Sequence, residues 1–363
     1  MIAKDSQSIE QKKKKETQRM TGGGDTLFMR VPSDPSSLCL SVPKATTTQM
    51  HPYKSSIVGR GGFGVVFHYH HPIDGKEYAI KRIRMDSESR RISAFREVQL
   101  LSTLHHPRIV RYHTSWIEMS SSEEAEDDSS DRSSNPYETL TNVSFDDSEI
   151  SSSLMPSTMC YSLCVQMELC TSTLAHYLEQ RTTLHRTMEL RMQIEISEGL
   201  AFLHQQGVVH GDVTPKNVLL TSSGAVKISD FGLAMVYDHP VFVGKRTSSI
   251  GVGLYQAPEV SSFSTTLRLD SSADVYSAGI LFFEMNSLFT TRMEFILHVQ
   301  KWKTQTGSLP PFLFLRCLIL LMICHQTSDR LAMFRVVEIL ESFRGSIYPT
   351  CQNILHQIVD QLF

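Results

Sequence analysis

Three side chains between residues 212 and 230 could hold a metal ion and accept a proton. Asp212 and Asn217 lie in the stretch "HGDVTPKNVLL" (210–220), and Asp230 lies in "SDFG". Carboxylate and amide oxygens are ligands that Mg²⁺ prefers, and an aspartate can take the proton of a hydroxyl group. Transfer of a phosphoryl group needs both functions, because the protein's part in that reaction is to position the reactants and neutralise charge.

An earlier glycine-rich stretch could close over the phosphates of a nucleotide. "GRGGFGVV" (59–66) satisfies the pattern G-x-G-x-x-G-x-V through Gly59, Gly61 and Gly64. Such a backbone is free of bulky side chains and can approach phosphate groups closely. Glycine-rich turns are common, so this stretch is a weak signal when it is taken alone.

A lysine and a glutamate complete the predicted phosphate site. Lys81 of "YAIK" lies on a predicted strand, where it can reach the α- and β-phosphates, and Glu97 of "FREV" lies in the next predicted helix, placed to pair with it. Asp212 is then the predicted base, while Asn217 and Asp230 each hold one Mg²⁺. A strand lysine or a helix glutamate is usually just a solvated side chain. The order of all these residues on the expected elements argues against chance.

The residues between these motifs predict a small strand-rich lobe followed by a larger helical lobe. Residues 54–83 are typical of three strands, with a hairpin at Asp74–Gly75, and residues 89–104 are typical of a helix with one apolar face. Two more strands are expected at 108–118 and 161–170. The main helical patterns that follow are 184–207, 271–288 and 329–343. The predicted fold class is α+β.

Composition divides the chain into ordered and polar regions. Residues 1–48 are rich in Ser, Thr, Lys and Gly without a hydrophobic period, and residues 119–157 are acidic and Ser-rich, so neither can build a core. We predict a disordered arm (1–48), an N-lobe (49–169) with a disordered insertion (119–157), a C-lobe (170–345) that completes a domain over 49–345, and a short tail (346–363).

Composition also argues against several classes of function. The net charge of −3 gives no reason to expect a nucleic-acid partner, and the N-terminus has no apolar segment typical of a secretory signal. The most hydrophobic stretch, 311–324, is too short to cross a bilayer and contains Arg316, so we expect a buried helix and no membrane partner. Seven cysteines without a C-x-x-C pair suggest neither disulfides nor zinc, and we expect a cytoplasmic protein.

The ordered motifs resemble those of protein kinases over about residues 53–345. The resemblance implies a bilobal fold, with ATP and Mg²⁺ as cofactors. It also implies an adenine pocket, with Glu168 to Cys170 as the hinge strand. The residues expected around the adenine ring are Val66, Ala79, Met167 and Leu219. The residues expected to support the large lobe are Glu259 of "QAPE", Arg330 of "SDR", which would pair with it, and Asp274 of "ADVYSAG", which would brace the catalytic loop.

Within the protein kinases, the chain resembles those that phosphorylate the alpha subunit of eukaryotic translation initiation factor 2, and most of all the haem-regulated inhibitor kinase. The matching stretches are "HPRIVRYHTSWIE" (106–118), "VQMELC" (165–170), "GKRT" (244–247) and "TRME" (291–294), together with the acidic insertion. The resemblance implies a protein substrate, lower translation initiation under stress, and a second copy of the chain as a candidate partner.

The same resemblance assigns residues to regulation and to substrate docking. Thr247 matches the position that is phosphorylated in the activation segment, and Ser248 and Ser249 could substitute for it. Thr291 and Glu294 fall on the positions that dock the substrate. Members of this group differ in their sensor regions, and we expect the 48 residues ahead of the domain to be too few for one. The activating signal is therefore not predicted.

Three residues depart from the protein kinase pattern. Gly211 stands where Arg is usual, Thr214 where a lysine contacts the γ-phosphate, and Val252 where the threonine of a "GT" pair is usual. Lys216 lies two residues beyond Thr214 on a long flexible stem, and we expect it, or bound Mg²⁺, to carry part of the missing charge. Gly211 offers no cation to a phosphorylated activation segment, so we expect phosphorylation to be weakly coupled to activity.

These departures leave two alternatives open beside the predicted kinase. One is a pseudokinase that binds nucleotide or partners without chemistry. The other is a serine/threonine kinase with an unrelated substrate. We favour a competent catalytic loop, because the metal ligands and the predicted base are all present, and a similar H-G-D loop occurs in an active atypical kinase of a tRNA-modification assembly.

Overall fold

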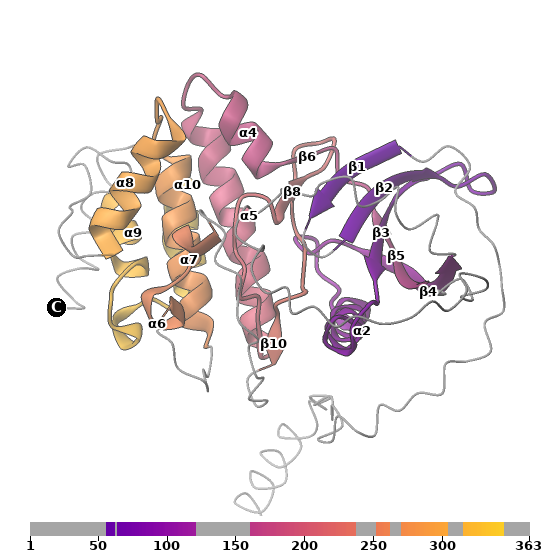
Figure 1. The fold of residues 1–363 in the computed structure, drawn as a ribbon. Coiled ribbons are helices and arrows are strands. Elements are labelled where there is room, and N and C mark those ends of the chain that lie inside the picture. Colours follow the sequence, from indigo (N-terminus) through magenta and orange to yellow (C-terminus); the bar gives the residue numbers. More distant parts are fainter. Residues whose placement is uncertain are drawn as a thin grey trace, which may run out of the picture. The chain divides into compact units, whose positions relative to one another are not determined.

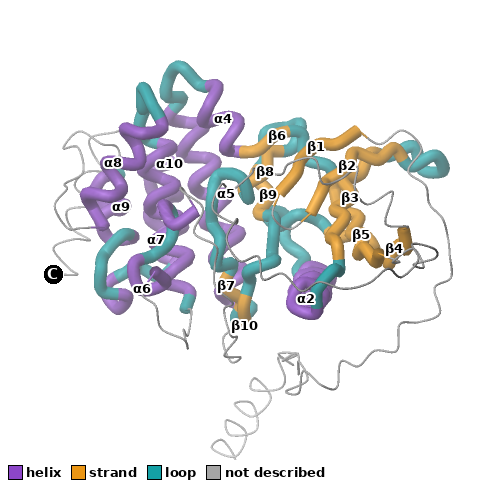
Figure 2. The backbone as a smooth tube through the Cα atoms, viewed as in Figure 1, coloured by secondary structure: helices purple, strands orange, loops and turns teal. Residues whose placement is uncertain are grey.

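The computed structural model describes six stretches of the chain: residues 56–61, 64–120, 160–236, 252–261, 270–303 and 315–344. The predicted arm, the predicted tail, most of the predicted insertion and activation-segment residues 247–249 lie outside them. The described stretches form the predicted α+β fold, with a strand-rich lobe followed by a helical lobe (Figures 1 and 2).

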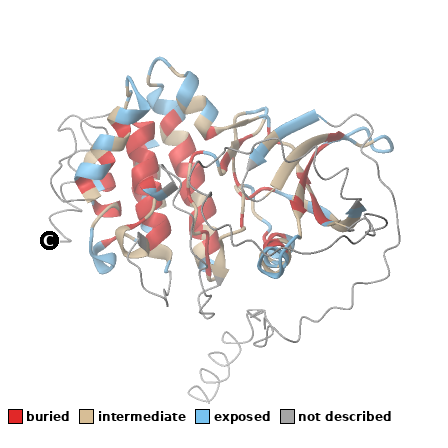
Figure 3. Ribbon diagram, in the orientation of Figure 1, coloured by how far each residue is buried: buried red, intermediate tan, exposed pale blue. Residues whose placement is uncertain are grey.

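Five antiparallel strands form the sheet of the small lobe, in the order β1-β2-β3-β5-β4. From β1 to β5 they span Ser56–Gly61, Gly64–His70, Glu77–Arg84, Tyr112–Ser120 and Cys160–Glu168. The turn between β2 and β3 contains the predicted Asp74–Gly75 pair, and Gly75 has a φ of +66°, which glycine adopts without strain. β3 and β5, which pair with each other near the middle of the sheet, are the most buried of these strands (Figure 3).

β4 continues two residues into the predicted insertion. Met119 pairs with Tyr161, and Ser120 pairs with Cys160. The serine-rich composition from Met119 onward predicted no regular structure, but pairing with a neighbouring strand outweighs a weak strand preference. The strand ends that flank the rest of the insertion are therefore adjacent in the sheet.

Helix α2 (Glu88–Thr103) belongs to the small lobe and carries Glu97. It begins after Ser87, whose hydroxyl accepts a hydrogen bond from the backbone N–H of Arg90, as expected of an N-cap residue. Ala94 and Leu101 are buried on the same helix as Glu97. The helix therefore turns Glu97 into the protein on the face that packs against the core.

Helices dominate the large lobe. They are α4 (Leu174–Gln180), α5 (Arg186–Gln205), α6 (Pro258–Ser261), α7 (Ser271–Met285), α8 (Arg292–Lys303), α9 (Arg316–Met322) and α10 (Met333–Arg344). Short strands accompany them: β6 (Ser172–Thr173), β7 (Val208–Val209), β8 (Val218–Leu220), β9 (Val226–Ile228) and β10 (Met235–Val236). The hydrophobic stretch 311–324 contributes α9, which is largely buried as predicted in its described part. None of the described helices is long and apolar enough to span a membrane.

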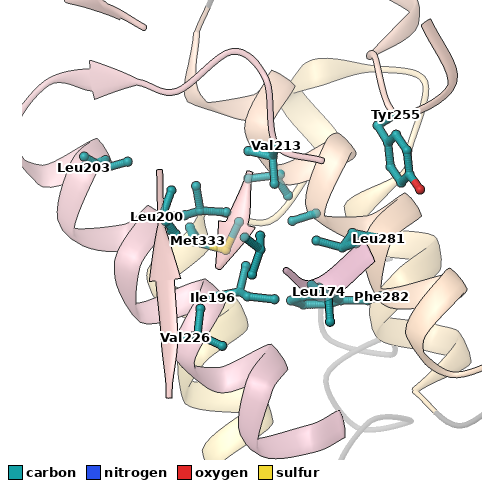
Figure 4. Close-up of a cluster of buried hydrophobic side chains, with 14 of the residues drawn as sticks. Leu174, Ile196, Leu200, Leu203, Val213, Val226, Tyr255, Leu281, Phe282 and Met333 are labelled. Atoms are coloured by element: carbon teal, nitrogen blue, oxygen red, sulfur yellow. The ribbon is translucent and has the colours of Figure 1, made fainter. Parts of the chain in front are cut away.

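The core of the large lobe is built around α5 and α7. Every residue from Ala273 to Met285 is buried, so α7 is enclosed on all sides (Figure 3). Side chains from several elements meet in this core, and those labelled in Figure 4 are Leu174, Ile196, Leu200, Leu203, Val213, Val226, Tyr255, Leu281, Phe282 and Met333. Val213 belongs to the stretch 210–220, so this core anchors the loop that carries Asp212.

Candidate active site

Lys81 on β3 contacts two carboxylates that are far from it in sequence. Its ammonium group donates hydrogen bonds to Glu97 Oε1 at 2.7 Å and to Asp230 Oδ1 at 2.9 Å. Lys81 and Glu97 are buried, with 7% and 3% of their surface exposed. Burial by itself lowers the pKa of Lys81, but the two carboxylates outweigh it, so the pKa is raised and the side chain stays a cation. A fixed positive charge is thus available beside Asp230.

Asp230 adopts a strained backbone conformation that turns it toward this lysine. Its φ is +66°, in the left-handed region that non-glycine residues rarely occupy. Such strain is of order 1–3 kcal/mol and is found where function constrains the backbone. The residue before it is held in place, because the backbone N–H of Ser229 donates to the carbonyl of Asn217 at 2.9 Å. The two predicted metal ligands therefore belong to directly linked segments.

The predicted base is held by the other predicted metal ligand. The side-chain amide of Asn217 donates to the backbone carbonyl of Asp212 at 2.8 Å and to Asp212 Oδ2 at 2.8 Å. Because the amide nitrogen is used in this way, the amide oxygen is the atom of Asn217 that can bind a cation. The oxygen donors of Asn217 and Asp230 suit Mg²⁺, which prefers such ligands.

Asp274 on α7 fixes the backbone just before the predicted base. Its carboxylate accepts hydrogen bonds from the backbone N–H of His210 and of Gly211, each at 2.8 Å, and lies 2.9 Å from His204 Nε2. Burial by itself raises the pKa of Asp274, but these hydrogen bonds and the nearby histidines outweigh it and lower the pKa. The structure thus places Asp274 where the resemblance expected a brace for the catalytic loop.

Gly211, the residue that replaces the usual arginine, has a φ of +75°. Only glycine adopts this left-handed conformation without a steric penalty from Cβ. The glycine therefore relaxes the backbone that an arginine would strain. The departure from the protein kinase pattern suits the local conformation and leaves the hydrogen bonds to Asp274 intact.

The predicted adenine pocket draws residues from both lobes. Ala79 pairs with Met167 across β3 and β5, and both are buried. Val66 lies on β2 opposite Lys81, and Leu219 lies on β8 in the large lobe. Val66, Ala79 and Met167 thus lie on strands that the sequence pattern predicted, whereas it predicted no strand for Leu219.

Glu168, the predicted hinge residue, is braced by contacts that the sequence did not predict. Its carboxylate accepts a hydrogen bond from the backbone N–H of Arg111 at 2.7 Å and lies 2.8 Å from the Lys227 ammonium. Its own N–H donates to the carbonyl of Arg111. Cys170, two residues on, is buried, and burial raises the pKa of its thiol to about 12, so it stays protonated. No signal in the sequence marks these two contacts. Arg111 contributes only its backbone, and a lysine on a strand, such as Lys227, is normally solvated.

The three glycines of the predicted phosphate loop differ in what requires them. A Cβ atom on Gly64, which has a φ of +139°, would lie 2.2 Å from the carbonyl oxygen of Arg82 on β3. Gly64 is therefore required by the strand pairing itself. Gly59 has open space around it, and Gly61 ends β1 directly opposite Gly64. Residues 62 and 63 lie outside the described part of the chain.

Glu259 and Arg330 form the expected pair in the large lobe. The Arg330 guanidinium donates to both carboxylate oxygens of Glu259, at 2.6 and 2.9 Å, and also to the carbonyl of Cys324 at 2.7 Å. Such a two-pronged contact fixes orientation as well as distance. The pair ties α6, and with it the end of the activation segment, to the residues that follow α9.

Thr291 and Glu294 both take part in starting helix α8. The backbone N–H of Glu294 donates to the Thr291 hydroxyl at 3.2 Å, and the Glu294 carboxylate accepts from the N–H of Thr290 at 2.9 Å. This arrangement satisfies N–H groups that have no partner inside the helix. Thr291 is exposed and Glu294 is half-buried, so the structure gives both a capping role and leaves each at least partly accessible.

The remaining predicted residues are less constrained by the structure. Lys216 is exposed on the loop after Thr214, and the carbonyl of Thr214 accepts the N–H of Asn217. The side chain of Val252 and the residues Thr247, Ser248 and Ser249 lie outside what the structure describes. Their roles stay predictions.

Comparison with known proteins agrees with this geometry. The family model for the protein kinase domain matches residues 53–306, more than half of the chain. The eIF-2-alpha kinase GCN2 of Arabidopsis thaliana is 32% identical over 255 residues, covering 65% of this chain and 20% of the plant protein. The interferon-induced, double-stranded RNA-activated protein kinase of Rattus norvegicus is 32% identical over 240 residues, covering 65% of this chain and 41% of the rat protein.

A bacterial relative shows that the similarity is not confined to eukaryotes. A probable serine/threonine-protein kinase of Streptomyces coelicolor is 29% identical over 244 residues, covering 66% of this chain and 30% of that protein. The chain spans about a fifth to two fifths of the length of these relatives. Together with the bilobal fold and the linked Lys81, Glu97, Asp230, Asn217 and Asp212, these matches show that the chain belongs to the protein kinase domain family and carries the domain of an ATP-dependent protein serine/threonine kinase.

Proposed function

We propose that this protein is an active cytoplasmic kinase that transfers the γ-phosphate of ATP to a serine of the alpha subunit of translation initiation factor 2, and so lowers translation initiation under stress. The observation that carries phosphoryl transfer is the linked set of polar contacts around Lys81 and Asp212. Asn217 and Asp230 would hold Mg²⁺, which supplies charge neutralisation at the phosphates when it is bound.

The chain's own residues account for positioning and proton transfer. Lys81, fixed by Glu97, presents its charge to the α- and β-phosphates. Asp212, held by Asn217 and by the loop that Asp274 anchors, is aligned to accept the proton of the attacking hydroxyl. The network is formed without an arginine at position 211, which supports a competent catalytic loop.

The choice of substrate rests on sequence similarity. The stretches 106–118 and 291–294 resemble those of kinases that phosphorylate the initiation factor alpha subunit. The plant relative is an eIF-2-alpha kinase, and the rat relative is a double-stranded RNA-activated protein kinase. The finer likeness to the haem-regulated inhibitor kinase rests on the same stretches. A homodimer is implied by the same resemblance, and sedimentation of the purified protein over a range of concentrations would test it.

Two alternatives are supported by particular observations. Gly211, Thr214 and Val252 motivate a pseudokinase, because they remove groups that most protein kinases use. The match to a probable bacterial serine/threonine-protein kinase motivates an active kinase with an unrelated substrate. The contacts of Asp212 and Asn217 favour an active enzyme over a pseudokinase.

One experiment separates the three. The purified protein is incubated with Mg-ATP and the purified alpha subunit, beside generic protein substrates, with an Asp212→Asn variant as the control for contaminating kinases. Phosphoserine on the alpha subunit supports the proposal. Phosphate on generic substrates alone supports an unrelated substrate, and phosphate on nothing supports a pseudokinase.

A further inference from the structure

The last residue of α8 reaches into the segment that precedes α6. The Lys303 ammonium donates hydrogen bonds to the backbone carbonyls of Gly253 and Gln256, the latter at 2.8 Å. Residues 252–254 form a short 3₁₀ turn, and Tyr255 and Gln256 lead from it to Pro258. A single lysine therefore joins two points of this turn that are three residues apart.

The first residue of α8 holds the same segment through Tyr255. Arg292 donates to the hydroxyl of Tyr255 at 3.1 Å and pairs with Glu284 of α7, and the Tyr255 hydroxyl also donates to the Glu284 carboxylate. Tyr255 is buried, and burial raises the pKa of its hydroxyl, so it remains a donor. The segment 253–256 is thus fastened to both ends of α8.

α8 itself is firmly seated on the large lobe. Phe295, Val299 and Trp302 are buried on one face of the helix, and the Trp302 ring meets Phe283 of α7 at a centroid distance of 4.2 Å. Lys303 follows directly after this anchored tryptophan. Its position is therefore set by packing, and its hydrogen bonds can transmit that position to the segment 253–256.

A lysine at this place is not explained by packing alone. Lys303 is partly buried, and burial lowers the pKa of its ammonium group to about 8, which means that the charged form is disfavoured there. A methionine would cover the same apolar surface without that cost. Two carbonyl oxygens that need donors account for the charged residue.

The segment 253–256 lies within reach of a polypeptide that enters the active site. α7 holds the catalytic loop through Asp274 and holds Tyr255 through Glu284, ten residues further along the same helix. Ten helical residues span about 15 Å. An extended chain covers that distance in roughly four to five residues. A substrate with its hydroxyl at Asp212 is therefore long enough to reach the segment that Lys303 holds.

We propose that Lys303 is a positioning residue that sets the segment 253–256 for the polypeptide substrate and couples this segment to helix α8. The inference rests on the proposed kinase function, because it concerns the protein substrate and not ATP. It assigns Lys303 no contact with the reacting atoms. Its loss should loosen the turn and weaken binding of the polypeptide while the nucleotide site is unaffected.

The test compares Lys303→Met with a matched control, Lys301→Met, which removes an exposed lysine two residues earlier on the same helix. Losing two hydrogen bonds should raise the KM for the protein substrate about tenfold. The KM for ATP should stay unchanged, and Lys303→Arg should restore most of the loss. Lys301→Met should behave as the wild type.

Hydrogen exchange provides a readout that does not depend on catalysis. The backbone amides of residues 253–257 should exchange faster in Lys303→Met, and not in Lys301→Met, while those of β3 and α2 stay protected. If Lys303→Met fails to fold, Lys303→Gln replaces it in both measurements. A wild-type protein that phosphorylates no substrate would refute the proposed function, and the exchange result would then decide only whether Lys303 holds the segment 253–256. An unchanged exchange rate together with an unchanged substrate KM would overturn the inference, as would an equal rise in the KM for ATP.

Discussion

The side-chain amide of Asn217 donates a hydrogen bond to the carboxylate of Asp212 at 2.8 Å. This contact joins the residue predicted to bind a cation to the residue predicted to accept a proton. Asn217 is linked in turn to the segment of Asp230 through the bond between its carbonyl and Ser229. The groups needed for phosphoryl transfer are therefore held by a short chain of hydrogen bonds, and each link predicts a measurable consequence.

Replacing Asp274 by Asn should destabilise the large lobe and make stability less sensitive to acid. The variant loses a buried charged acceptor of the N–H groups of His210 and Gly211, at a cost of roughly 2–4 kcal/mol. The folded pKa of Asp274 lies below its ordinary value of 3.8, so its contribution is full above that value and is lost as the pH falls toward the folded pKa. Urea unfolding at pH 7 and below pH 4 measures the difference. A gap between the two proteins that is just as large at the lower pH would contradict this assignment.

Replacing residues 121–159 by a short Gly-Ser turn should leave catalysis intact. Ser120 and Cys160 are directly paired at the ends of β4 and β5, so a tight connection can join them without moving either strand. The entropy of closing a loop changes only slowly with its length, which limits any effect on stability. Initial rates on the alpha subunit and on generic substrates measure the outcome. Loss of activity on every substrate would show that the insertion contributes to the catalytic lobe itself.

The sequence could predict Lys81, Glu97, Asp212, Asn217 and Asp230 because their motifs fix both residue type and chain order. It could not predict the brace at Glu168, since Arg111 contributes only backbone atoms and Lys227 resembles any strand lysine. Lys303 was missed for the same reason, because its partners are carbonyls about fifty residues away. These contacts depend on how distant segments meet in three dimensions, which the spacing of side chains along the chain does not specify.

Gly211 should make activity depend only weakly on phosphate on the activation segment. Thr247→Ala is expected to cost this protein little, because residue 211 offers the phosphate no cation. Gly211→Arg should make activity depend more on phosphate, while the left-handed backbone at this position lowers stability by roughly 1 kcal/mol. Gly211→Ala carries the same backbone strain without the charge and is the matched control. Initial rates before and after phosphatase treatment decide the matter, and a wild type that loses nearly all activity on dephosphorylation would contradict the prediction.

Lys216 should contribute modestly to transfer and not to ATP binding. It is the exposed cation nearest in sequence to Thr214, where most protein kinases have a lysine. Lys216→Ala is expected to lower kcat about tenfold or less, because an exposed charge is screened by solvent. Single-turnover rates at low and high salt measure the effect, which should shrink as salt rises. An unchanged rate at low salt would show that Lys216 makes no contribution to phosphoryl transfer.

The most direct test of phosphoryl transfer through Asp212 is the initial rate at which the alpha subunit gains phosphoserine from Mg-ATP, measured for the wild type and for Asp212→Asn. Asparagine keeps the size of the side chain but cannot accept the proton, so the rate should fall by about 10²–10⁴-fold. The affinity for ATP should change little, because Lys81 and Asp230 keep their contact. An Asp212→Asn protein that transfers phosphate at nearly the wild-type rate would contradict the account.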